Sequence, residues 1–432
     1  MRMYDIIEKK KLGKELTEEE IALFVNGYTN GTIPDYQMSA LCMAICLRSM
    51  TKDETFYLTK YMLNSGEVVD LSRFGNLSVD KHSTGGVGDK TTLIVAPIVA
   101  SLGLKVAKMS GRGLGFTGGT VDKLESISGY KTSLDASEFL SQVEKVGIAV
   151  VGQSGNLAPA DKKIYALRDV TCTVDSIPLI ASSIMSKKLA SGSHNIVLDV
   201  KCGSGAFMKD KESATSLAKA MVEIGKSFGR NVCAIITDMD APLGKNIGNA
   251  LEVKEAIEIL QGKGDSNLKE LCLIISANMV SLALNIDYDE AYKMVEDTIS
   301  SGSAFEKMKE WIYSQGGNVK EIEDPSLLPK AKYESVLKLN FNGYISGIDA
   351  EKIGIASMLL GAGRKTKEDT IDNSAGIVLN VKIGDSVEDK PYLTMYSSDP
   401  SLFEQCEKAL LPAFKFSDEK PEKKSVVLDI VR

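Results

Sequence analysis

Two glycine-rich loops, each lying between an apolar run and a helical pattern, constrain the fold of this chain more than any other feature. Residues 80–92 read DKHSTGGVGDKTT, and residues 108–125 read KMSGRGLGFTGGTVDKLE. Glycines let backbone N–H groups approach an anion closely, and serine and threonine hydroxyls add neutral donors. Because the two loops lie so close in sequence, they predict alternating strands and helices around a phosphate site.

A lysine and a titratable imidazole stand at the start of the first loop. Lys81 supplies positive charge, and His82 is one of only two histidines in the chain. The neighbouring lysine disfavours the imidazolium form, whereas a bound phosphate dianion restores it. We therefore interpret His82 as a proton donor coupled to phosphate binding. The alternative is an ordinary tight turn with a structural histidine.

The second loop follows the apolar run 104–107 and precedes a short helical pattern at 121–125. Ser110 and Thr120 stand at its two ends, where their hydroxyls and neighbouring N–H groups close over the same anion. The order strand, glycine loop, helix is therefore expected here.

Two better-known phosphate motifs come close to these loops. Residues 113–118 satisfy the dinucleotide pattern G-x-G-x-x-G, with Asp135 as the acidic residue, so a dehydrogenase stays as a distant alternative. Residues 88–91 read GDKT and lack the glycine directly before lysine that a P-loop requires, which argues against an NTPase.

Two predicted helices between residues 161 and 190 carry a third group of polar residues. Tyr165 and Arg168 are three residues apart on the first helix, and Ser183 and Lys187 are four apart on the second, so each pair shares a helical face. Arginine, serine and lysine converging from two helices suit a small ligand with several acceptor oxygens, such as a uracil ring. A solvated helix face is the alternative, because lysine and arginine are usually surface residues.

Three segments together resemble the thymidine and pyrimidine-nucleoside phosphorylases. They are DKHSTGGVGD (80–89), SGRGLG with TGGT (110–115 and 117–120) and YALRDVT (165–171), and the resemblance covers essentially the whole chain. It implies reversible phosphorolysis of uridine, deoxyuridine and thymidine to the free base and (deoxy)ribose 1-phosphate. Inorganic phosphate is then the co-substrate, and the chemistry requires no cofactor. A thymidine phosphorylase restricted to deoxynucleosides is the nearer alternative.

The resemblance also assigns site residues, each by its position in this sequence. Phosphate binding is implied for Lys81, Ser83, Thr92, Lys108, Ser110 and Thr120. Pyrimidine or nucleoside binding is implied for Leu114, Tyr165, Arg168, Ser183, Lys187 and Phe207. His82, Arg168 and Lys187 are the expected catalytic residues. They neutralise negative charge on the departing base, while phosphate attacks the sugar and offsets its oxocarbenium-like charge.

Two positions depart from the pattern of these phosphorylases, and a third bears on the substrate. Phe116 stands where the second loop usually carries histidine. Lys90 stands where many relatives have a small hydroxyl residue, which weighs against the monovalent cation, K+, that the bacterial enzymes hold. Lys108 favours uridine as well as thymidine, because broad-specificity members tend to carry lysine there. The residues of the implied cation site are Gly88, Lys90, Leu243, Asn246 and Glu255.

The composition fits an enzyme of a reducing cytosol. At 432 residues with 44% apolar residues, the chain is expected to form two or three domains with buried cores. A formal net charge of −7 argues against a nucleic-acid partner. Seven scattered cysteines without C-x-x-C spacing indicate free thiols. Neither a signal peptide nor an apolar run long enough to span a bilayer is expected, so we predict a cytoplasmic protein without a membrane partner.

Local patterns predict the elements of the fold. Residues 17–20 and 51–54 are capping boxes, and Pro34 opens a third helix whose Leu41, Met43, Ala44 and Leu47 are expected to be buried. Apolar runs separated by helical patterns predict a largely parallel sheet covered on both faces. These runs are 92–99, 148–151, 196–200 and 232–236.

The expected fold class is α/β, with a small all-helical domain, a large α/β domain with a mixed, mostly parallel sheet, and a C-terminal α+β lobe. Residues 1–66 with 160–192 form the first, 67–159 with 193–332 the second, and 333–432 the third. The base-binding helices and the phosphate loops then lie on different domains, so catalysis requires closure across a cleft. The apolar N-terminal helices are expected to form a homodimer interface.

Two other classes of protein share parts of this pattern. Phosphoribosyltransferases of the anthranilate type have a similar glycine-rich loop and helical domain, but they need a diphosphate substrate with magnesium, and carboxylate pairs for that metal are not evident. A non-catalytic nucleoside-binding protein would use the same pocket, although His82 beside the phosphate loop argues against it.

Overall fold

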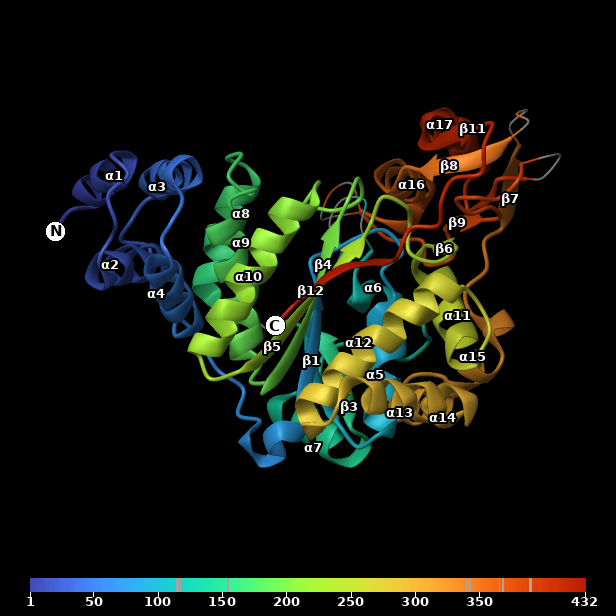
Figure 1. Cartoon of the computed structure of the whole chain (residues 1–432), viewed down its shortest axis with the longest axis horizontal. Coiled ribbons are helices and arrows are strands. Elements are labelled where there is room, and N and C mark those ends of the chain that lie inside the picture. The colour runs from blue at the N-terminus through green and yellow to red at the C-terminus, as the bar shows by residue number, and fades with distance from the viewer. Residues whose placement is uncertain are drawn as a thin grey trace.

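The computed structural model describes residues 1–113, 116, 118–153, 155–338, 341, 343–364, 366, 369–387 and 391–432. N-terminal helices lie at one end of the molecule, a sheet with helices on both faces lies in the middle, and a lobe of small antiparallel sheets lies at the other end (Figure 1). The predicted α/β class, with its helical domain, mostly parallel sheet and C-terminal α+β lobe, is confirmed.

Four helices open the chain, and two of them begin at the predicted capping boxes. Thr17 accepts the backbone N–H of Glu20, and Thr51 accepts that of Glu54, while each glutamate side chain bonds back to the cap. Both predicted capping boxes are thus confirmed. The helices are α1 (Met3–Lys11), α2 (Glu18–Thr29), α3 (Asp35–Arg48) and α4 (Lys52–Leu63).

Burial on α3 differs from the expectation. Leu41 and Ala44 are buried, but Met43 is 38% exposed and Leu47 is 75% exposed. The prediction was wrong for these two residues, which lie outside the apolar core that Leu41 shares with α1 and α8. The sequence does not show whether another element packs over the helix face that carries an apolar side chain.

Two later helices, α8 (Pro159–Asp169) and α9 (Ile177–Ala190), return to the N-terminal helices. Ile164 of α8 and Leu179 of α9 belong to the same apolar core as Phe24 and Leu58. The segments that connect this helical part to the sheet are bonded to each other, since Glu67 N–H donates to Asn156 O at 3.0 Å and Val69 N–H to Ala190 O at 2.8 Å.

The central sheet has the strand order β12-β5-β4-β1-β2-β3. Its first five strands in sequence are parallel, and only β12 runs antiparallel, against β5. All eight residues of β4 are buried, as expected for a central strand covered on both faces. The strands are β1 (Ser78–Ser83), β2 (Lys105–Ser110), β3 (Ile148–Gly152), β4 (Asn195–Cys202), β5 (Asn231–Asp238) and β12 (Val427–Val431).

One predicted strand is a helix. The apolar run 92–99 lies in α5 (Thr91–Ser101), in which all residues from Thr91 to Ala100 are buried. This helix packs against α11, α12 and α14, so its whole circumference is apolar and the run shows no helical period. A short apolar run rich in valine and isoleucine does not distinguish a buried strand from a buried helix.

The remaining helices cover the two faces of the sheet. α9 and α10 pack in one apolar core with β4 and β5, and α5 and α12 pack in a second core on the other face. α12 is long and apolar enough to cross a membrane by length and composition, which the sequence analysis missed, but 61% of its apolar window is buried in the protein. The helices are α6 (Thr120–Glu125), α7 (Ala136–Val146), α10 (Lys211–Ser227), α11 (Asn249–Leu260), α12 (Ser266–Leu284), α13 (Tyr288–Ser300), α14 (Ser303–Ser314) and α15 (Val319–Glu323).

The C-terminal lobe contains an antiparallel sheet of order β6-β9-β10-β7 and the strand pair β11-β8. The expected lobe of residues 333–432 differs from the structure at its end, because β12 leaves it and joins the central sheet (Figure 1). Conversely, β6 from the α/β part joins the lobe's sheet. The elements are β6 (Asn246–Ile247), β7 (Tyr333–Leu337), β8 (Tyr344–Ile348), α16 (Ala350–Ser357), β9 (Gly376–Leu379), β10 (Leu393–Ser397), α17 (Phe403–Leu410) and β11 (Phe414–Ser417).

Candidate active site

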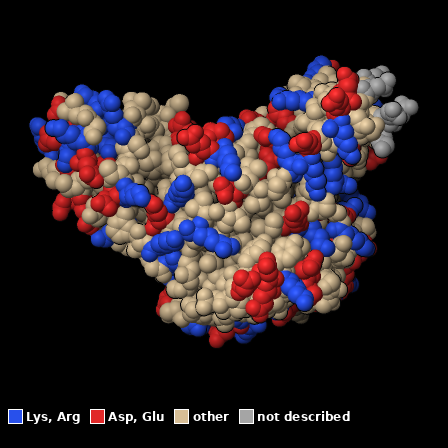
Figure 2. Space-filling view, viewed as in Figure 1, with Lys and Arg blue, Asp and Glu red and all other residues tan. Residues whose placement is uncertain are grey.

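The two glycine-rich loops follow β1 and β2 at the carboxyl ends of the sheet strands, where ligands bind in open parallel sheets. Figure 2 shows the surface hollowed between the helical part and the C-terminal lobe, with basic and acidic side chains interspersed on this face. The candidate site therefore lies where the sheet, α8 and α9 meet.

Alternation along β1 sends neighbouring side chains to opposite faces of the sheet. Asp80 pairs in register with Ile196, which packs against α9 and α10, whereas Lys81 pairs with Val197, which belongs to the core around α5. His82 is two residues after Asp80, so its side chain starts from the same face of the sheet as that of Asp80. Lys81 and His82, adjacent in the motif, thus start from different faces of the strand.

Asp80 joins the sheet to the helical part. Its carboxylate accepts from Lys188 Nζ on α9 at 2.6 Å and from Lys108 Nζ on β2 at 3.3 Å, and all three side chains are buried. Burial works to raise the pKa of Asp80, but the two lysines lower it below its usual value. Burial in turn lowers the pKa of Lys108 to about 8, although Asp80 opposes the shift.

His82 lies half-buried in a strongly positive environment. Burial, and then the charges of Lys188, Lys108, Lys187 and Lys81, hold the pKa of its imidazole well below the usual value. The ring is therefore neutral at neutral pH in the protein alone. This agrees with the expectation that neighbouring lysines disfavour the imidazolium form.

Lys81 is neutralised by the protein itself. Its ammonium bonds to Thr91 Oγ1 and lies 3.6 Å from Asp89 and 3.5 Å from Asp199, which also pairs with Lys201 at 2.8 Å. Burial opposes the charged form of Asp89, but Lys81 and Lys201 keep the pKa of its carboxyl well below the usual value. Two lysines and two aspartates thus balance in charge beneath the first loop, and Lys81 is not an isolated positive charge.

The second glycine loop is closed by its own ends and by Asp122 of α6. A Cβ on Gly119 would lie 2.2 Å from the backbone N of Gly113, so only glycine fits there. Asp122 accepts from Gly113 N–H at 2.6 Å, from Arg112 at 3.2 Å and from Arg364 of the C-terminal lobe at 3.1 Å. The C-terminal lobe is therefore tied to this loop.

Lys123 joins the two glycine loops. Its buried ammonium donates to Asp89 O of the first loop at 2.9 Å and to Gly118 O of the second at 3.0 Å, and it lies 3.1 Å from Glu252. A single cation thus fixes the spacing of the two loops.

Three of the residues predicted to bind the base, Tyr165, Ser183 and Lys187, come together between α8 and α9. Lys187 Nζ donates to Asp161 Oδ2 at 2.7 Å and to Ser183 Oγ at 3.2 Å, and it lies 5.6 Å from the centre of the Tyr165 ring. The other Asp161 carboxylate oxygen is buried with no hydrogen-bond partner among the described residues. This cluster is partly open to solvent, since the Lys187 side chain is not fully covered.

Arg168 lies beside this cluster but is held by the backbone. Its guanidinium donates to Thr173 O at 3.0 Å, Val174 O at 2.8 Å and Leu179 O at 3.1 Å, and the residue is buried. Burial lowers the pKa of this guanidinium from its very high usual value. Three of its five N–H groups therefore fix the turn between α8 and α9.

The other predicted site residues fall into three groups. Ser83, Ser110 and Thr120 are half-buried at the ends of the loops, and Thr92 is buried on the first turn of α5. Phe207 is 57% exposed on the segment after β4. Leu114 lies outside the described residues.

The five residues of the expected cation site also lie together, but Lys90 is a donor there and not a ligand. Its ammonium bonds to Leu243 O, Asn246 O and Glu255. Across the described parts of the chain, no group of three His, Cys, Asp or Glu side chains is placed to hold a metal ion.

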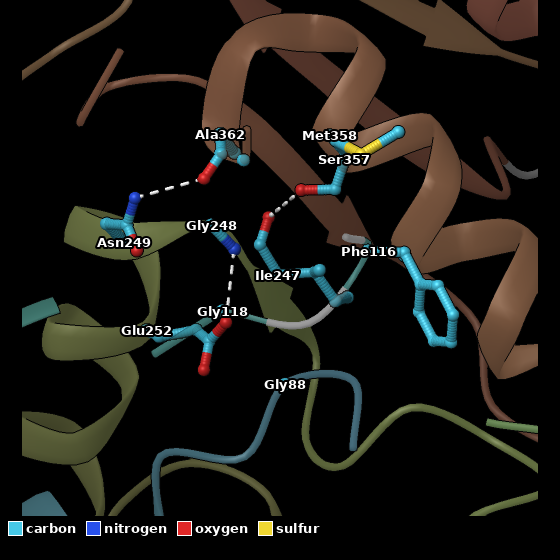
Figure 3. Close-up of a pocket in the computed structure, with 12 residues that line it drawn as sticks. Gly88, Phe116, Gly118, Ile247, Gly248, Asn249, Glu252, Ser357, Met358 and Ala362 are labelled. Atoms are coloured by element: carbon cyan, nitrogen blue, oxygen red, sulfur yellow. Dashed lines mark hydrogen bonds between the residues drawn. The ribbon is translucent and has the colours of Figure 1, made fainter. Parts of the chain in front are cut away.

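A small cavity lies away from the base cluster, between the second loop and the C-terminal lobe (Figure 3). Asn249 donates to Ala362 O at 3.1 Å and Ser357 donates to Ile247 O at 3.3 Å across it. Phe116, which replaces the usual histidine, lines this cavity. The cavity belongs to the contact between lobes, because of the predicted site residues only Gly88 lines it.

Several residues of the site escaped the sequence analysis. Asp80 stands beside Lys81 in the first motif. Because side chains alternate along a strand, the sequence indicates that Asp80 and Lys81 face opposite sides of the sheet and have different partners. No local pattern pairs it with Lys188, which lies 108 positions away. Asp161 and Asp199 likewise acquire their roles from residues far away in sequence.

Comparisons with known proteins agree with this architecture. Models of the glycosyl transferase family match its helical bundle domain at residues 4–66 and its a/b domain at residues 75–305. The model of the pyrimidine nucleoside phosphorylase C-terminal domain matches residues 344–417. Anthranilate phosphoribosyltransferase from Thermus thermophilus is similar in structure, with a TM-score of 0.57 at 16% identity over 72% of this chain and 98% of that chain, which shows the fold alone. The fold and the glycine loops thus define a glycosyl transferase.

Relatives with high identity specify the family. Pyrimidine-nucleoside phosphorylases from Staphylococcus haemolyticus and Geobacillus stearothermophilus are 57% identical, and that from Bacillus subtilis is 58% identical, each over 400 residues and 92% of both chains. The chain therefore belongs to the pyrimidine-nucleoside phosphorylases, a family of pentosyltransferase enzymes.

Proposed function

We propose that this enzyme catalyses the reversible phosphorolysis of uridine, deoxyuridine and thymidine to the free base and (deoxy)ribose 1-phosphate. The observation that carries the proposal is the convergence of Lys188 from α9 and Lys108 from β2 on the carboxylate of Asp80, two residues before His82. These two lysines and Lys187 also lower the pKa of His82. Positive groups from the helical part and from the sheet thereby face one region. Family membership supplies the reaction, and this convergence supplies the charge that it needs.

The base is bound by the α8–α9 cluster. Lys187 and Ser183 donate to ring carbonyls, with Tyr165 beside them, and the remaining N–H groups of Arg168 complete the set. As the N-glycosidic bond breaks, negative charge grows on these carbonyls and the fixed cations stabilise it. Because Asp161 and the backbone carbonyls already orient Lys187 and Arg168, little reorganisation is needed at that moment.

Phosphate is bound by the two glycine loops, with hydroxyls from Ser83, Thr92, Ser110 and Thr120 and with ammonium groups from Lys108 and Lys81. Asp89 and Asp199 already balance the charge of Lys81, so Lys108 supplies most of the net positive charge. Its dianion offsets the surrounding lysines and so raises the pKa of His82, which then protonates the leaving base. Phosphate is both the nucleophile and the counter-charge of the oxocarbenium-like sugar. We propose no further cofactor for this chemistry.

Phosphorolysis monitored by ultraviolet absorbance tests the function. We expect uridine, deoxyuridine and thymidine each to yield free base only when phosphate is present, with inosine as a control that does not react. Conversion of the deoxynucleosides alone would show an activity restricted to that of a thymidine phosphorylase. It would also contradict the inference that Lys108 favours uridine as well as thymidine. Nucleoside binding without product would indicate a binding protein, and neither binding nor product would refute the proposal.

The pKa of Lys108 predicts how phosphate binding depends on pH. Because this pKa is about 8, the ammonium loses its proton as the pH rises from about 7.5 to about 9, while phosphate stays a dianion. We expect the KM for phosphate to rise roughly eightfold over this interval, in proportion to the loss of the ammonium form. Lys108→Met should have a high KM that changes little with pH. Initial rates at several phosphate concentrations measure this, and parallel profiles for the two proteins would contradict the role.

We further propose that the enzyme is a cytoplasmic homodimer whose subunits contact each other through the N-terminal helices, with α3 at the interface. Tyr36, Met43 and Leu47 lie seven and four residues apart on α3, so they share one helical face, and all three are exposed. An exposed apolar stripe of this kind fits a symmetric interface. Sedimentation equilibrium tests it, and a mass equal to one chain of 46.6 kDa would exclude it.

A further inference from the structure

Lys90 lies at the centre of a shell of oxygen atoms. Its side chain is completely buried, and Nζ donates to Leu243 O at 2.9 Å, to Asn246 O at 2.8 Å and to Glu255 Oε2 at 2.6 Å. An ammonium group has three N–H donors and no acceptor, so all of its bonding capacity is used. Two backbone carbonyls and one carboxylate thus surround a single positive charge.

This arrangement does not fit the K+ that the sequence resemblance implies. Lys90 Nζ already bonds to oxygens of three residues of the implied site, Leu243, Asn246 and Glu255. The carbonyl of the fourth, Gly88, accepts the backbone N–H of Lys90 at 2.9 Å, and an ammonium supplies no oxygen ligand. The Glu255 carboxylate is also bonded to the backbone N–H groups of Lys245 at 2.8 Å and Asn246 at 3.0 Å. A second cation would face the Lys90 charge and would compete with it for the Glu255 carboxylate.

The position connects the first glycine loop to the segment before α11. Lys90 is the last residue before α5, and its backbone N–H donates to Gly88 O at 2.9 Å. Leu243 N–H in turn donates to Val87 O at 3.0 Å. The ammonium therefore holds segment 243–246 and Glu255 against the end of the loop, as a bound ion would.

We propose that the Lys90 ammonium is a built-in replacement for a monovalent cation, so that this enzyme neither binds nor needs K+ at this position. The inference concerns the architecture of the loop and does not depend on the proposed reaction. It predicts that shortening Lys90 to a residue with an oxygen atom creates a cation site in this chain.

The wild-type protein gives the first test. We expect its thermal unfolding midpoint to be the same in potassium chloride and in choline chloride of equal ionic strength. Equilibrium dialysis against rubidium chloride, with rubidium as the probe for K+, should show no ion retained by the protein. Retention of one rubidium ion per chain, or stabilisation by potassium over choline, would overturn the proposal.

Two variants give the second test. Lys90→Met removes the charge but keeps the length of the side chain, and its midpoint should fall by roughly 10 °C in both salts. Lys90→Thr leaves space and adds a hydroxyl oxygen, so its midpoint should fall similarly in choline but recover by about 5 °C in potassium. It should also retain rubidium in dialysis.

Loss of stability in Lys90→Thr without any response to potassium would show that the shell is not a cation site and would reject the proposal. If neither variant folds, the wild-type dialysis decides alone. All these measurements are made without nucleoside or phosphate, so their failure leaves the proposed phosphorolysis intact. Failure of phosphorolysis would equally leave the ion-binding result unchanged.

Discussion

Replacing Asp80 with alanine is expected to lower the free energy of unfolding by about 3–5 kcal/mol, because it leaves the ammonium groups of Lys108 and Lys188 buried without their shared carboxylate. The loss should be large because Asp80 is fully buried and both lysines are nearly so. Since Lys188 belongs to α9 and Lys108 to β2, the change also loosens the contact between the helical part and the sheet. Denaturation by urea, followed by circular dichroism, measures the effect.

Asp5→Ala is the matched control, because Asp5 pairs with Arg2 at 2.6 Å in an exposed position. Exposed ion pairs contribute little to stability, and Asp5 also accepts the Arg2 backbone N–H at the start of α1, so this variant should lose no more than about 1 kcal/mol. If Asp80→Ala were as stable as Asp5→Ala, the buried triad would not stabilise the fold.

The effect of Asp80 depends on pH in a defined direction. Lys108 and Lys188 hold the pKa of this carboxyl below its usual value despite burial. A carboxyl with a lowered folded pKa stabilises the protein fully above its unfolded pKa of about 4, and this contribution is lost as the pH falls through the folded value. The difference between wild type and Asp80→Ala should therefore be constant near neutral pH and shrink in acid.

The sequence predicts those parts of the fold that depend on neighbouring residues. Thr17 and Thr51 cap their helices through residues three positions away, so both boxes are visible in the sequence. The run 92–99 is misleading because α5 is buried on all sides and has no polar face to set its period. Likewise, nothing local distinguishes the buried Leu41 from the exposed Leu47.

The same distinction applies to the candidate site. Glycine loops and polar residues at helical spacing indicate which residues lie close together in the site. They do not indicate which other groups of the protein already pair with the charged side chains. Arg168 is held by carbonyls of a turn that the helix pattern does not describe, and Lys81 is balanced by Asp199 on another strand. Lys81 beside His82 indicates the direction in which the pKa of the imidazole shifts. However, three of the four lysines that lower this pKa come from elsewhere in the chain.

Lys187→Met is expected to reduce kcat/KM for uridine by roughly 100- to 1000-fold, as the loss of one preorganised donor does at other sites of developing negative charge. Asp161 and Ser183 use two of the three N–H donors of Lys187, and the third has no partner among the described residues, so it is available to a base carbonyl. Most of the effect should fall on kcat, because the charge on the base grows only as the bond breaks. Steady-state phosphorolysis measures it.

Lys163→Met on α8 is the matched control, since Lys163 donates to Thr29 O at the end of α2 at 2.7 Å, so its replacement should leave the rate unchanged. Asp161→Asn separates the effect of orienting the Lys187 ammonium from the effect of its charge. It keeps a hydrogen bond to Lys187 but removes the carboxylate that fixes the ammonium, so we expect a smaller loss than for Lys187→Met. A folded Lys187→Met that kept more than about a tenth of the wild-type rate would show that this lysine does not stabilise the leaving base.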